Sequence, residues 1–282
     1  MDLSLPFRGS AAVASGAVGR GALGGRRFRR VFPDVYVAAG TELDLATQAL
    51  AAGLWAGDRG VVAGYAAAEL LDASCGPPDA AVDVIGAVRS RAPAGIRLRR
   101  VRLGDTDVVH RCGVPVTSPL RTAFDLARWA DGVTERVAAV DTIAHVWRLD
   151  VSRIRETWFA HLGAHGSADL AKVLALVDPR SESPMESRIR MALHLAGLPP
   201  PCIQYRVGGH RLDLAYPSAF LGVEHDGGHH REPAQARADL VREAELARAG
   251  WRILRFPGRA VVAEPEHVVA AVRAALIATS VQ

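Results

Sequence analysis

The chain has 282 residues, of which 49% are hydrophobic and 23% are charged, and its formal net charge is +4. These values are ordinary for a soluble globular protein, and the length allows two domains or three small ones. No apolar run approaches the length that spans a bilayer, and the first residues lack the basic start and clean apolar stretch of a signal peptide. We therefore expect a cytoplasmic protein with no membrane partner.

The lysine, arginine and cysteine content indicates which kinds of partner and which kinds of site the chain can have. Lys172 is the sole lysine, so the positive charge is carried by arginine, whose planar fork of donors suits phosphate and hence nucleic acid. A GC-rich genome would give the same arginine bias without functional meaning. Cys75, Cys112 and Cys202 are isolated. They support neither a disulfide framework nor a zinc site, and they fit a reducing compartment.

Residues 1–40 predict a winged-helix-like basic module. The stretch before Arg26 could form two short helices broken at Gly16, and a short β-type run follows the arginines. Two short helices and a basic hairpin are the order of a winged helix, in which one helix enters a DNA groove and the hairpin contacts phosphate. The candidate DNA-binding side chains are Arg26, Arg27, Arg29 and Arg30. Because several glycines weaken the second helix, a disordered basic arm is the alternative.

Residues 41–178 predict a mixed region of helices and strands. Helix is expected over 44–72, strands over 81–88, 96–103 and 107–117, and helices over 118–130, 133–147, 151–162 and 167–178. Ser118 is a good N-cap and Pro119 suits the first position of a helix. Asp125 and His145 lack catalytic spacing, so we expect them to be capping, paired or solvent-facing groups.

The polar stretch 178–184 is the best candidate for a linker, and a further domain is expected over residues 179–282. Its predicted elements are a helix over 184–197, strands over 203–207, 210–216 and 220–225, a helix over 234–250, a strand over 251–256 and a helix over 265–277. This order indicates an α/β (α+β) fold in which helices flank a central mixed sheet.

Three carboxylates are predicted to converge on one face of this sheet. Leu212 and Leu214 are expected to face the core, which turns Asp213 to the opposite face, and the same alternation turns Glu224 and Asp226 that way. The short connection between the two strands favours a hairpin, which would set Asp213 roughly across from residues 222–224.

Uncompensated, such carboxylates would repel one another and raise each other's pKa values. A hard divalent cation such as Mg²⁺ or Mn²⁺ removes the repulsion, since oxygen ligands are what it prefers. The same cation polarises phosphoryl oxygens and activates water, as phosphodiester hydrolysis requires. The alternative is a set of surface acids that protect an edge strand from aggregation.

At these positions the sequence resembles the PD-(D/E)XK nuclease superfamily, in the branch allied to very-short-patch-repair (Vsr-like) endonucleases. The resemblance covers about residues 180–282 and is carried by Glu186, Asp213, the run Glu224-His225-Asp226-Gly227, His230, Asp239, Arg242 and "GWRILR". It implies metal ligation by Asp213 and Glu224, support from Glu186, and a proton-transfer or phosphate role for His229 or His230.

Asp226 occupies the position of the superfamily's lysine, and this region contains no lysine. The cationic role is therefore left to arginine, histidine or a second metal. The candidate catalytic residues are Glu186, Asp213, Glu224, Asp226 and His230. Arg242 is a candidate for DNA phosphate, although it could equally pair with Glu245 or Asp239 on its own helix.

The first two regions resemble, more loosely, the AbiEi-type antitoxin and regulator proteins. The matching stretches are "RRFRRVFPDVYV" and "VPVTSPLRTAFDLAR". This resemblance implies DNA binding and a toxin or phage-defence partner. The sequence thus predicts a DNA-binding protein with a metal-dependent endonuclease-like domain. The alternatives are a non-catalytic DNA-binding regulator that keeps the nuclease fold as a scaffold, and a protein-interaction scaffold.

Overall fold

The computed structural model describes residues 2–86, 91–227 and 233–280. The chain divides into two compact units, one formed by Met1–Ala130 with Val146–Leu174 and the other by Asp131–His145 with Ala175–Gln282. Both units mix helices and sheets, which confirms the α+β class. Within the part of the chain that the structure describes, no helix combines the length and apolar character needed to cross a bilayer.

The N-terminal segment forms a small sheet with two short helical pieces. Its elements are β1 (Phe7–Arg8), α1 (Gly9–Ala14), the 3-10 helix η1 (Arg20–Gly24), β2 (Phe28–Phe32) and β3 (Val35–Ala38). The strand order is β1-β3-β2, so β2 and β3 form the expected hairpin and β1 adds a third strand. Gly16, at φ +74°, lies between the two helical pieces. The second piece is a 3-10 helix because glycines interrupt it.

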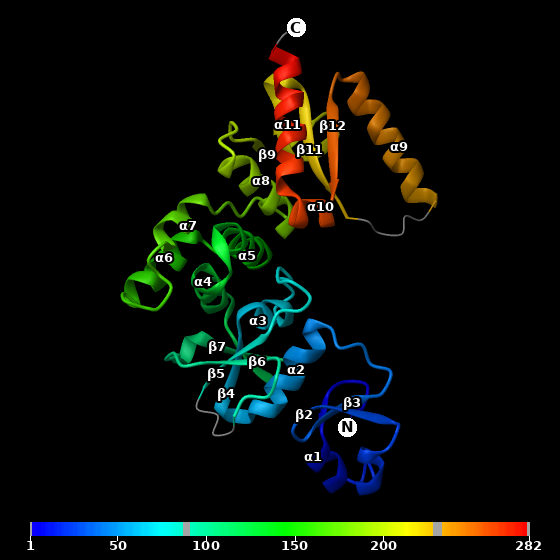
Figure 1. The fold of residues 1–282 in the computed structure, drawn as a ribbon, viewed down its shortest axis with the longest axis vertical. Helices are drawn as coiled ribbons and strands as arrows, with labels where there is room; N and C mark the ends of the chain where they lie inside the picture. The colour runs from blue at the N-terminus through cyan, green and yellow to red at the C-terminus, as the bar shows by residue number, and fades with distance from the viewer. Residues whose placement is uncertain (1, 87–90, 228–232, 281–282) are drawn as a thin grey trace. The chain divides into compact units, whose positions relative to one another are not determined.

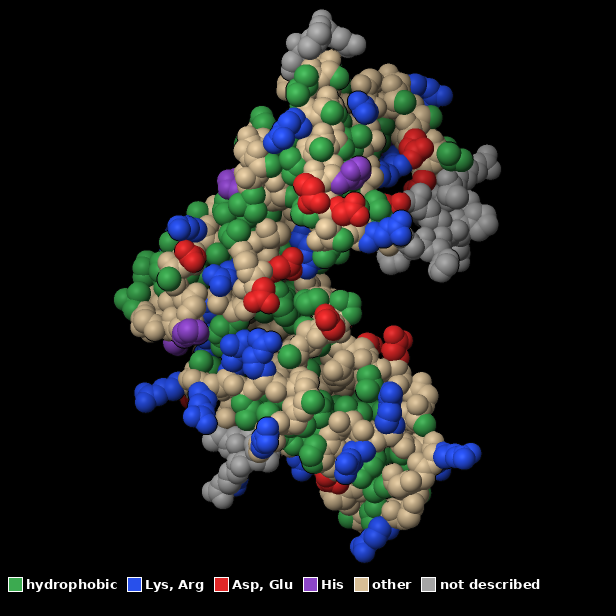
Figure 2. Space-filling model, viewed as in Figure 1, with side chains coloured by type: hydrophobic (Ala, Val, Ile, Leu, Met, Phe, Trp, Pro, Cys, Tyr) green, Lys and Arg blue, Asp and Glu red, His purple; other side chains and the backbone are tan. Residues whose placement is uncertain are grey.

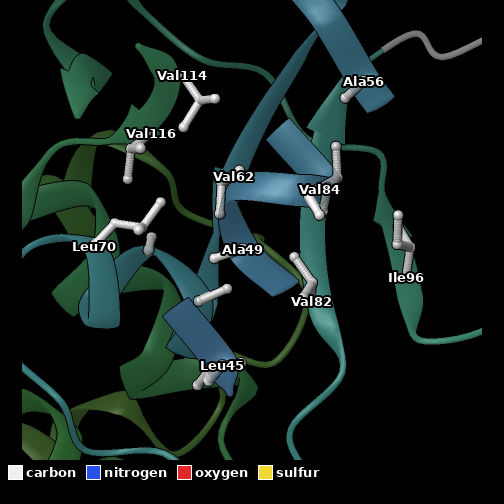
Figure 3. Packing of buried hydrophobic residues seen from close by; sticks show 14 of the residues in the cluster. Leu45, Ala49, Ala56, Val62, Leu70, Val82, Val84, Ile96, Val114 and Val116 are labelled. Atoms are coloured by element: carbon white, nitrogen blue, oxygen red, sulfur yellow. The ribbon is translucent and has the colours of Figure 1, made fainter. Parts of the chain in front are cut away.

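A five-stranded sheet forms the centre of the same unit (Figure 1). Its strands, in spatial order β6-β5-β4-β8-β7, and the elements between them are α2 (Leu45–Ala56), η2 (Gly57–Arg59), β4 (Gly60–Ala63), α3 (Gly64–Leu70), β5 (Val82–Gly86), β6 (Ile96–Arg99), η3 (Asp105–Asp107), β7 (Val108–Arg111) and β8 (Val114–Thr117). Figure 3 shows α2 side chains such as Ala49 packed against Val62 and Val84 of the sheet.

The prediction of helix within 44–72 is wrong at β4 (Gly60–Ala63). Val61, Val62 and Ala63 pair with β5, and Val62 also pairs with Val116 of β8, so β4 lies in the middle of the sheet. Two β-branched residues and a place between two partner strands outweigh the helical propensity of the alanines that follow. Gly64, at φ +62°, then turns the chain from β4 into α3.

Three helices complete the unit: α4 (Pro119–Trp129), α6 (Val151–Ala160) and α7 (Leu170–Leu176). Ser118 caps α4 by accepting a hydrogen bond from Arg121 N, as expected. Asp125 is fully buried and accepts hydrogen bonds from Arg121 Nε at 2.9 Å and Arg128 Nη2 at 2.5 Å. Arg121, Asp125 and Arg128 therefore form a buried ion network that joins successive turns of α4.

The C-terminal unit is built around a four-stranded sheet. Its elements are α5 (Gly132–Trp147, of which residues 132–145 belong to this unit), α8 (Pro184–Leu195), β9 (Cys202–Val207), β10 (His210–Tyr216), η4 (Pro217–Ala219), β11 (Leu221–Asp226), α9 (Pro233–Arg248), β12 (Arg252–Pro257), α10 (Gly258–Ala263) and α11 (Pro265–Ser280). The spatial order is β12-β11-β10-β9, with β11 and β12 parallel and the other pairs antiparallel. The predicted order of elements is confirmed, with α10 as an addition.

Two apolar clusters cover the two faces of this sheet. On one face, Leu214 and Val223 pack with residues of α8, α10 and α11, and α11 lies along β11 in Figure 1. On the other face, Leu212 packs with Trp251 and with Leu246 of α9. A Cβ on Gly222 would lie 2.7 Å from Ile253 Cδ1 and 3.0 Å from Leu212 Cδ1 on this second face, so the glycine is required for the close packing.

A buried carboxylate of α5 fixes α8, the helix that carries Glu186. Asp141 is fully buried and accepts hydrogen bonds from Ser187 Oγ and Arg190 Nη2, both at 2.6 Å, and from Asp178 N at 2.7 Å. Burial raises the pKa of Asp141 to about 6 although Arg190 opposes the shift. The buried Asp141 carboxylate therefore holds the first two turns of α8 against α5.

We expect Asp141→Ala to destabilise the C-terminal unit by on the order of 3 kcal/mol, because it leaves the Arg190 charge buried without its carboxylate. Urea unfolding and hydrogen exchange of peptides from α5 and α8 would measure the loss. Asp169→Ala removes an acid whose side chain is 60% exposed and pairs with the more exposed Lys172, and it should change stability by less than about 0.5 kcal/mol. Unchanged protection of α8 in Asp141→Ala would contradict the assignment.

Candidate functional site

The candidate site lies where the two central strands of the C-terminal sheet part. The pairing of β10 with β11 ends at Leu214 opposite Val223. Beyond this point β10 continues to pair with β9 and β11 with β12. Asp213 and Glu224 are the next residues on the two parting strands. The topology therefore brings two carboxylates to the edge of an opening in the sheet.

Four polar side chains form a row across the sheet at this level. Gln204 lies opposite Asp213, since the pairs on either side are Leu212 with Tyr205 and Leu214 with Ile203. Glu224 is in parallel register with Arg255. The row thus runs Gln204, Asp213, Glu224, Arg255 from β9 to β12.

The strict alternation expected for β10 is wrong at this row. Leu212 and Leu214 were expected on one face, but they belong to the two opposite apolar clusters of the sheet. Gln204, on the neighbouring strand, has φ +52° in the left-handed region. Such a residue interrupts the regular pleat, as in a β-bulge, and a change of face between flanking residues is the usual result.

Glu186 reaches this row from the first turn of α8. It is 5% exposed, and its Oε2 accepts hydrogen bonds from Gln204 Nε2 at 2.8 Å and from Glu182 N at 3.0 Å. Its backbone N–H donates to Ser183 Oγ, the N-cap of the helix. Burial raises the pKa of Glu186, and these hydrogen bonds oppose the shift. Glu186 is therefore both a capping residue and a neighbour of the row.

Asp213 has little local compensation for its charge. Among the described residues its carboxylate accepts one hydrogen bond, from His225 N to Oδ2 at 3.3 Å. Burial, together with the neighbouring carboxylates Glu186 and Glu224, raises the pKa of Asp213 to about 7, although Arg242 opposes the shift. Two of the predicted acidic neighbours therefore influence Asp213, one from the hairpin and one from α8.

Glu224 has the opposite environment, because two arginines hold it. Its side chain is 7% exposed. Arg242 of α9 donates from Nη1 to Oε2 at 3.0 Å and from Nη2 to Oε1, and Arg255 Nε lies 3.3 Å from Oε2. Arg255 also pairs with Glu243, the next residue on α9. The buried charge of Glu224 is thus balanced from a helix and from the adjacent strand.

The remaining candidates near the acids have different outcomes. Asp226 ends β11, half-buried and in register with Pro257. His225 is half-buried on the side of α8 and α10, since a Cβ on Gly258 would lie 3.2 Å from its Nε2. His229 and His230 lie outside the described residues.

The four N-terminal arginines are exposed on and beside β2. Arg29 Nη2 donates to Thr41 O at 2.7 Å, and the Arg27 guanidinium lies 5.3 Å from the centre of the Phe28 ring. Arg26 and Arg30 are exposed as well. In Figure 2, Lys and Arg side chains project singly from the unit that contains the N-terminus. The predicted phosphate-binding side chains are therefore accessible to a partner.

The donor set at the row suits a hard cation. Among the described residues, no three His, Cys, Asp or Glu side chains are grouped closely enough to hold a metal ion. However, Gln204 Oε1 is buried without a hydrogen-bond partner beside Asp213, and an amide oxygen is a ligand of the class that Mg²⁺ and Mn²⁺ accept. The Asp213 carboxylate and this amide oxygen fit such a cation, while Glu224 fits it only without Arg242.

Two residues of the site escaped the sequence analysis. The sequence analysis quoted Arg255 only as part of "GWRILR". The alternation of side chains in that strand places Arg255 on the same face as Ile253, and this pattern could have indicated its position. Gln204 carries no signal of its own, because its place in the row depends on the pairing of β9 with β10.

We expect Asp213→Asn to stabilise the metal-free protein more at pH 8 than at pH 4. Between these values the folded state keeps a proton that the unfolded chain, with a pKa near 3.8, has released. Stability from this group is therefore present in acid and lost as the pH rises to about 7. The gain at pH 8 should be on the order of 1–3 kcal/mol. Denaturant titrations in chelator would measure it, with exposed Glu264→Gln as the control. Equal gains at both pH values would show that Asp213 titrates normally.

Comparison with known proteins identifies part of this unit. Residues 186–276 match the family model REase_MTES_1575, a restriction endonuclease-like family. An uncharacterised protein of Mycobacterium tuberculosis, found in strains CDC 1551 / Oshkosh and H37Rv, is 30% identical over 188 residues. The alignment covers 62% of this chain and 65% of each relative. No solved structure matches the chain. The segment that carries the parting strands and their carboxylates is therefore similar to a restriction endonuclease-like family, which supports a nuclease-like domain in the C-terminal part of the chain.

Proposed function

We propose that the protein is a metal-dependent DNA endonuclease that hydrolyses phosphodiester bonds. The observation that carries the proposal is the position of Asp213 and Glu224 at the parting of β10 and β11, inside a restriction endonuclease-like domain. Carboxylates with perturbed pKa values, such as Asp213, cluster at functional sites. The sequence resemblance to the PD-(D/E)XK superfamily assigns these two carboxylates to metal binding.

In this proposal Asp213 and Glu224 hold a Mg²⁺ or Mn²⁺ ion, and Gln204 contributes its unpartnered amide oxygen. When bound, the ion supplies Lewis acidity toward a phosphoryl oxygen. Glu186 orients Gln204 through the 2.8 Å hydrogen bond to Nε2, which points Oε1 away from Glu186. Asp226 and His230 are the proposed proton-transfer groups. Because Asp226 stands at the position of the superfamily's lysine, the cationic role toward the phosphate is left to arginine, histidine or a second metal.

The alternative is a non-catalytic DNA-binding regulator of antitoxin type. The pairing of Glu224 with Arg242 and Arg255 favours it, because a carboxylate neutralised by two arginines can be purely structural. Asp226 in place of lysine points in the same direction. In this case the nuclease fold would serve as a scaffold, and a toxin or defence protein would be the partner.

Both the endonuclease proposal and the regulator alternative include DNA binding by the exposed arginines of the β2 region. A short helix, a 3-10 helix and a basic hairpin are the winged-helix order, and Arg26, Arg27, Arg29 and Arg30 are the phosphate-contacting candidates. The cleavage site, and any Vsr-like preference for a particular DNA structure, would be set by contacts of the C-terminal domain.

We expect the purified protein to nick or cut DNA in Mn²⁺ or Mg²⁺ but not in chelator. Asp213→Ala and Glu224→Ala should each reduce the rate by at least about 100-fold, since loss of a ligand costs more than loss of its supporting contacts. Plasmid, linear and single-stranded DNA would be followed on gels. Glu264→Gln, an exposed acid of the same domain, should cut at the wild-type rate. Equal cutting by all variants would indicate a contaminating nuclease, and no cutting on any DNA would favour the regulator.

The basic hairpin generates a separate expectation about salt. Replacing Arg26, Arg27, Arg29 and Arg30 with alanine should reduce the slope of log affinity against log salt by up to about 3–4, because each phosphate contact releases close to one counterion. Fluorescence anisotropy with a labelled duplex would measure the slopes. The matched control replaces Arg153 and Arg155, which are exposed on α6. If the Arg153/Arg155 variant reduces the slope and the hairpin variant does not, the DNA-binding surface lies on α6 and not on the hairpin.

A further inference from the structure

Arg242 occupies both oxygens of Glu224. Its Nη1 donates to Oε2 at 3.0 Å and its Nη2 donates to Oε1, so the planar guanidinium caps the carboxylate in a two-pronged arrangement. Nη2 also donates to Arg211 O at 3.0 Å. Arg211 lies on β10 beyond the last pair with β11, so its carbonyl is one that the parting of the strands leaves available. Arg242 therefore bridges the opening between β10 and β11.

A metal ion and this guanidinium compete for the same place. A cation shared by Asp213 and Glu224 needs an oxygen of Glu224 on the side that faces the opening, and Arg242 covers both oxygens there. Arg255 makes a single 3.3 Å contact with Glu224 from the neighbouring strand, and a second pair with Glu243 holds it. Removal of Arg242 alone would thus free an oxygen and still leave Glu224 a partner.

We propose that Arg242 is an internal counter-ion of the metal site, a positioning residue that holds Glu224 until a divalent cation displaces it. The inference rests on the proposed function and specifies how the site loads. The displaced guanidinium is then free at the edge of the opening, where its fork of donors matches a DNA phosphate. Metal loading and phosphate binding are coupled in this way through one side chain.

The position of Arg242 permits the exchange. Its side chain is 25% exposed, whereas that of Glu224 is 7% exposed, so the arginine is the partner that can move into solvent. It lies on α9, which contributes one fully buried apolar side chain, Leu246, among its described residues. Charged contacts of Glu243 and Glu245 with Arg255 and His210 supply further attachment.

The experiment measures Mn²⁺ binding by isothermal titration calorimetry on the full chain, without DNA. If Arg242 holds Glu224 in about nine of ten metal-free molecules, it raises the apparent Kd about tenfold. Arg242→Gln should therefore bind Mn²⁺ about tenfold more tightly than wild type, and its DNA cleavage should be slower. Arg248→Gln removes the same charge from an exposed position on the same helix and should leave the Kd unchanged.

A second variant separates displacement from a general field effect. Arg242→Lys keeps the charge but loses the two-pronged hydrogen bonding, so under the proposal it also binds Mn²⁺ more tightly. An unchanged or weaker Kd in both Arg242 variants, with melting curves that show a folded protein, overturns the inference. If wild type binds no Mn²⁺ and cuts no DNA in any metal, the proposed function fails as well. If wild type binds and cuts but Arg242 has no effect on the Kd, the inference alone fails.

Discussion

The ion cluster around Glu224 connects three consecutive elements of the chain. Arg242 comes from α9, Arg255 from β12 and Glu224 from β11, and all three meet at the level where β10 turns away. A carboxylate that is 7% exposed would carry a large desolvation penalty without these partners. The position of α9 over the sheet, the geometry of the opening and the chemistry available to Asp213 all depend on this compensation.

The contrast between the two central carboxylates has a physical cause. Glu224 faces arginines, whereas Asp213 faces Glu186 and a backbone N–H. The raised pKa of Asp213 is a perturbation of the kind that clusters at sites of acid–base or metal chemistry. Structural ion networks also shift pKa values, as buried Asp125 and Asp141 show in this protein. The restriction endonuclease-like match over residues 186–276 distinguishes the Asp213 region from those two networks.

Local patterns in the sequence were sufficient for most elements of the C-terminal domain. The predicted strands over 210–216, 220–225 and 251–256 correspond to β10, β11 and β12, and the predicted helix over 184–197 corresponds to α8. What failed was set by partners distant in sequence. Residues 61–63 became a strand because β5 and β8 lie on both sides of them. Leu212 and Leu214 lie on opposite faces of the sheet at the level of Gln204. The left-handed backbone of Gln204 cannot be predicted from the spacing of apolar residues. The pairing of Glu224 with two arginines likewise depends on the approach of α9 and β12.

The way α9 is attached makes the opening sensitive to ionic strength. Along its described side chains, Arg242, Glu243 and Glu245 pair with the sheet, and Leu246 is buried against it. Leu240 and Val241 are exposed. The pairs of Glu243 and Glu245, whose side chains are about half exposed, weaken as the Debye length shrinks from about 8 Å at physiological salt toward about 3 Å at 1 M, whereas the buried Glu224 pair and the contact of Leu246 are affected much less. Rising salt should therefore weaken the attachment of α9 to the sheet through its exposed ion pairs, while Leu246 keeps the C-terminal part of the helix packed against the sheet. Access to the carboxylates would then depend on ionic strength.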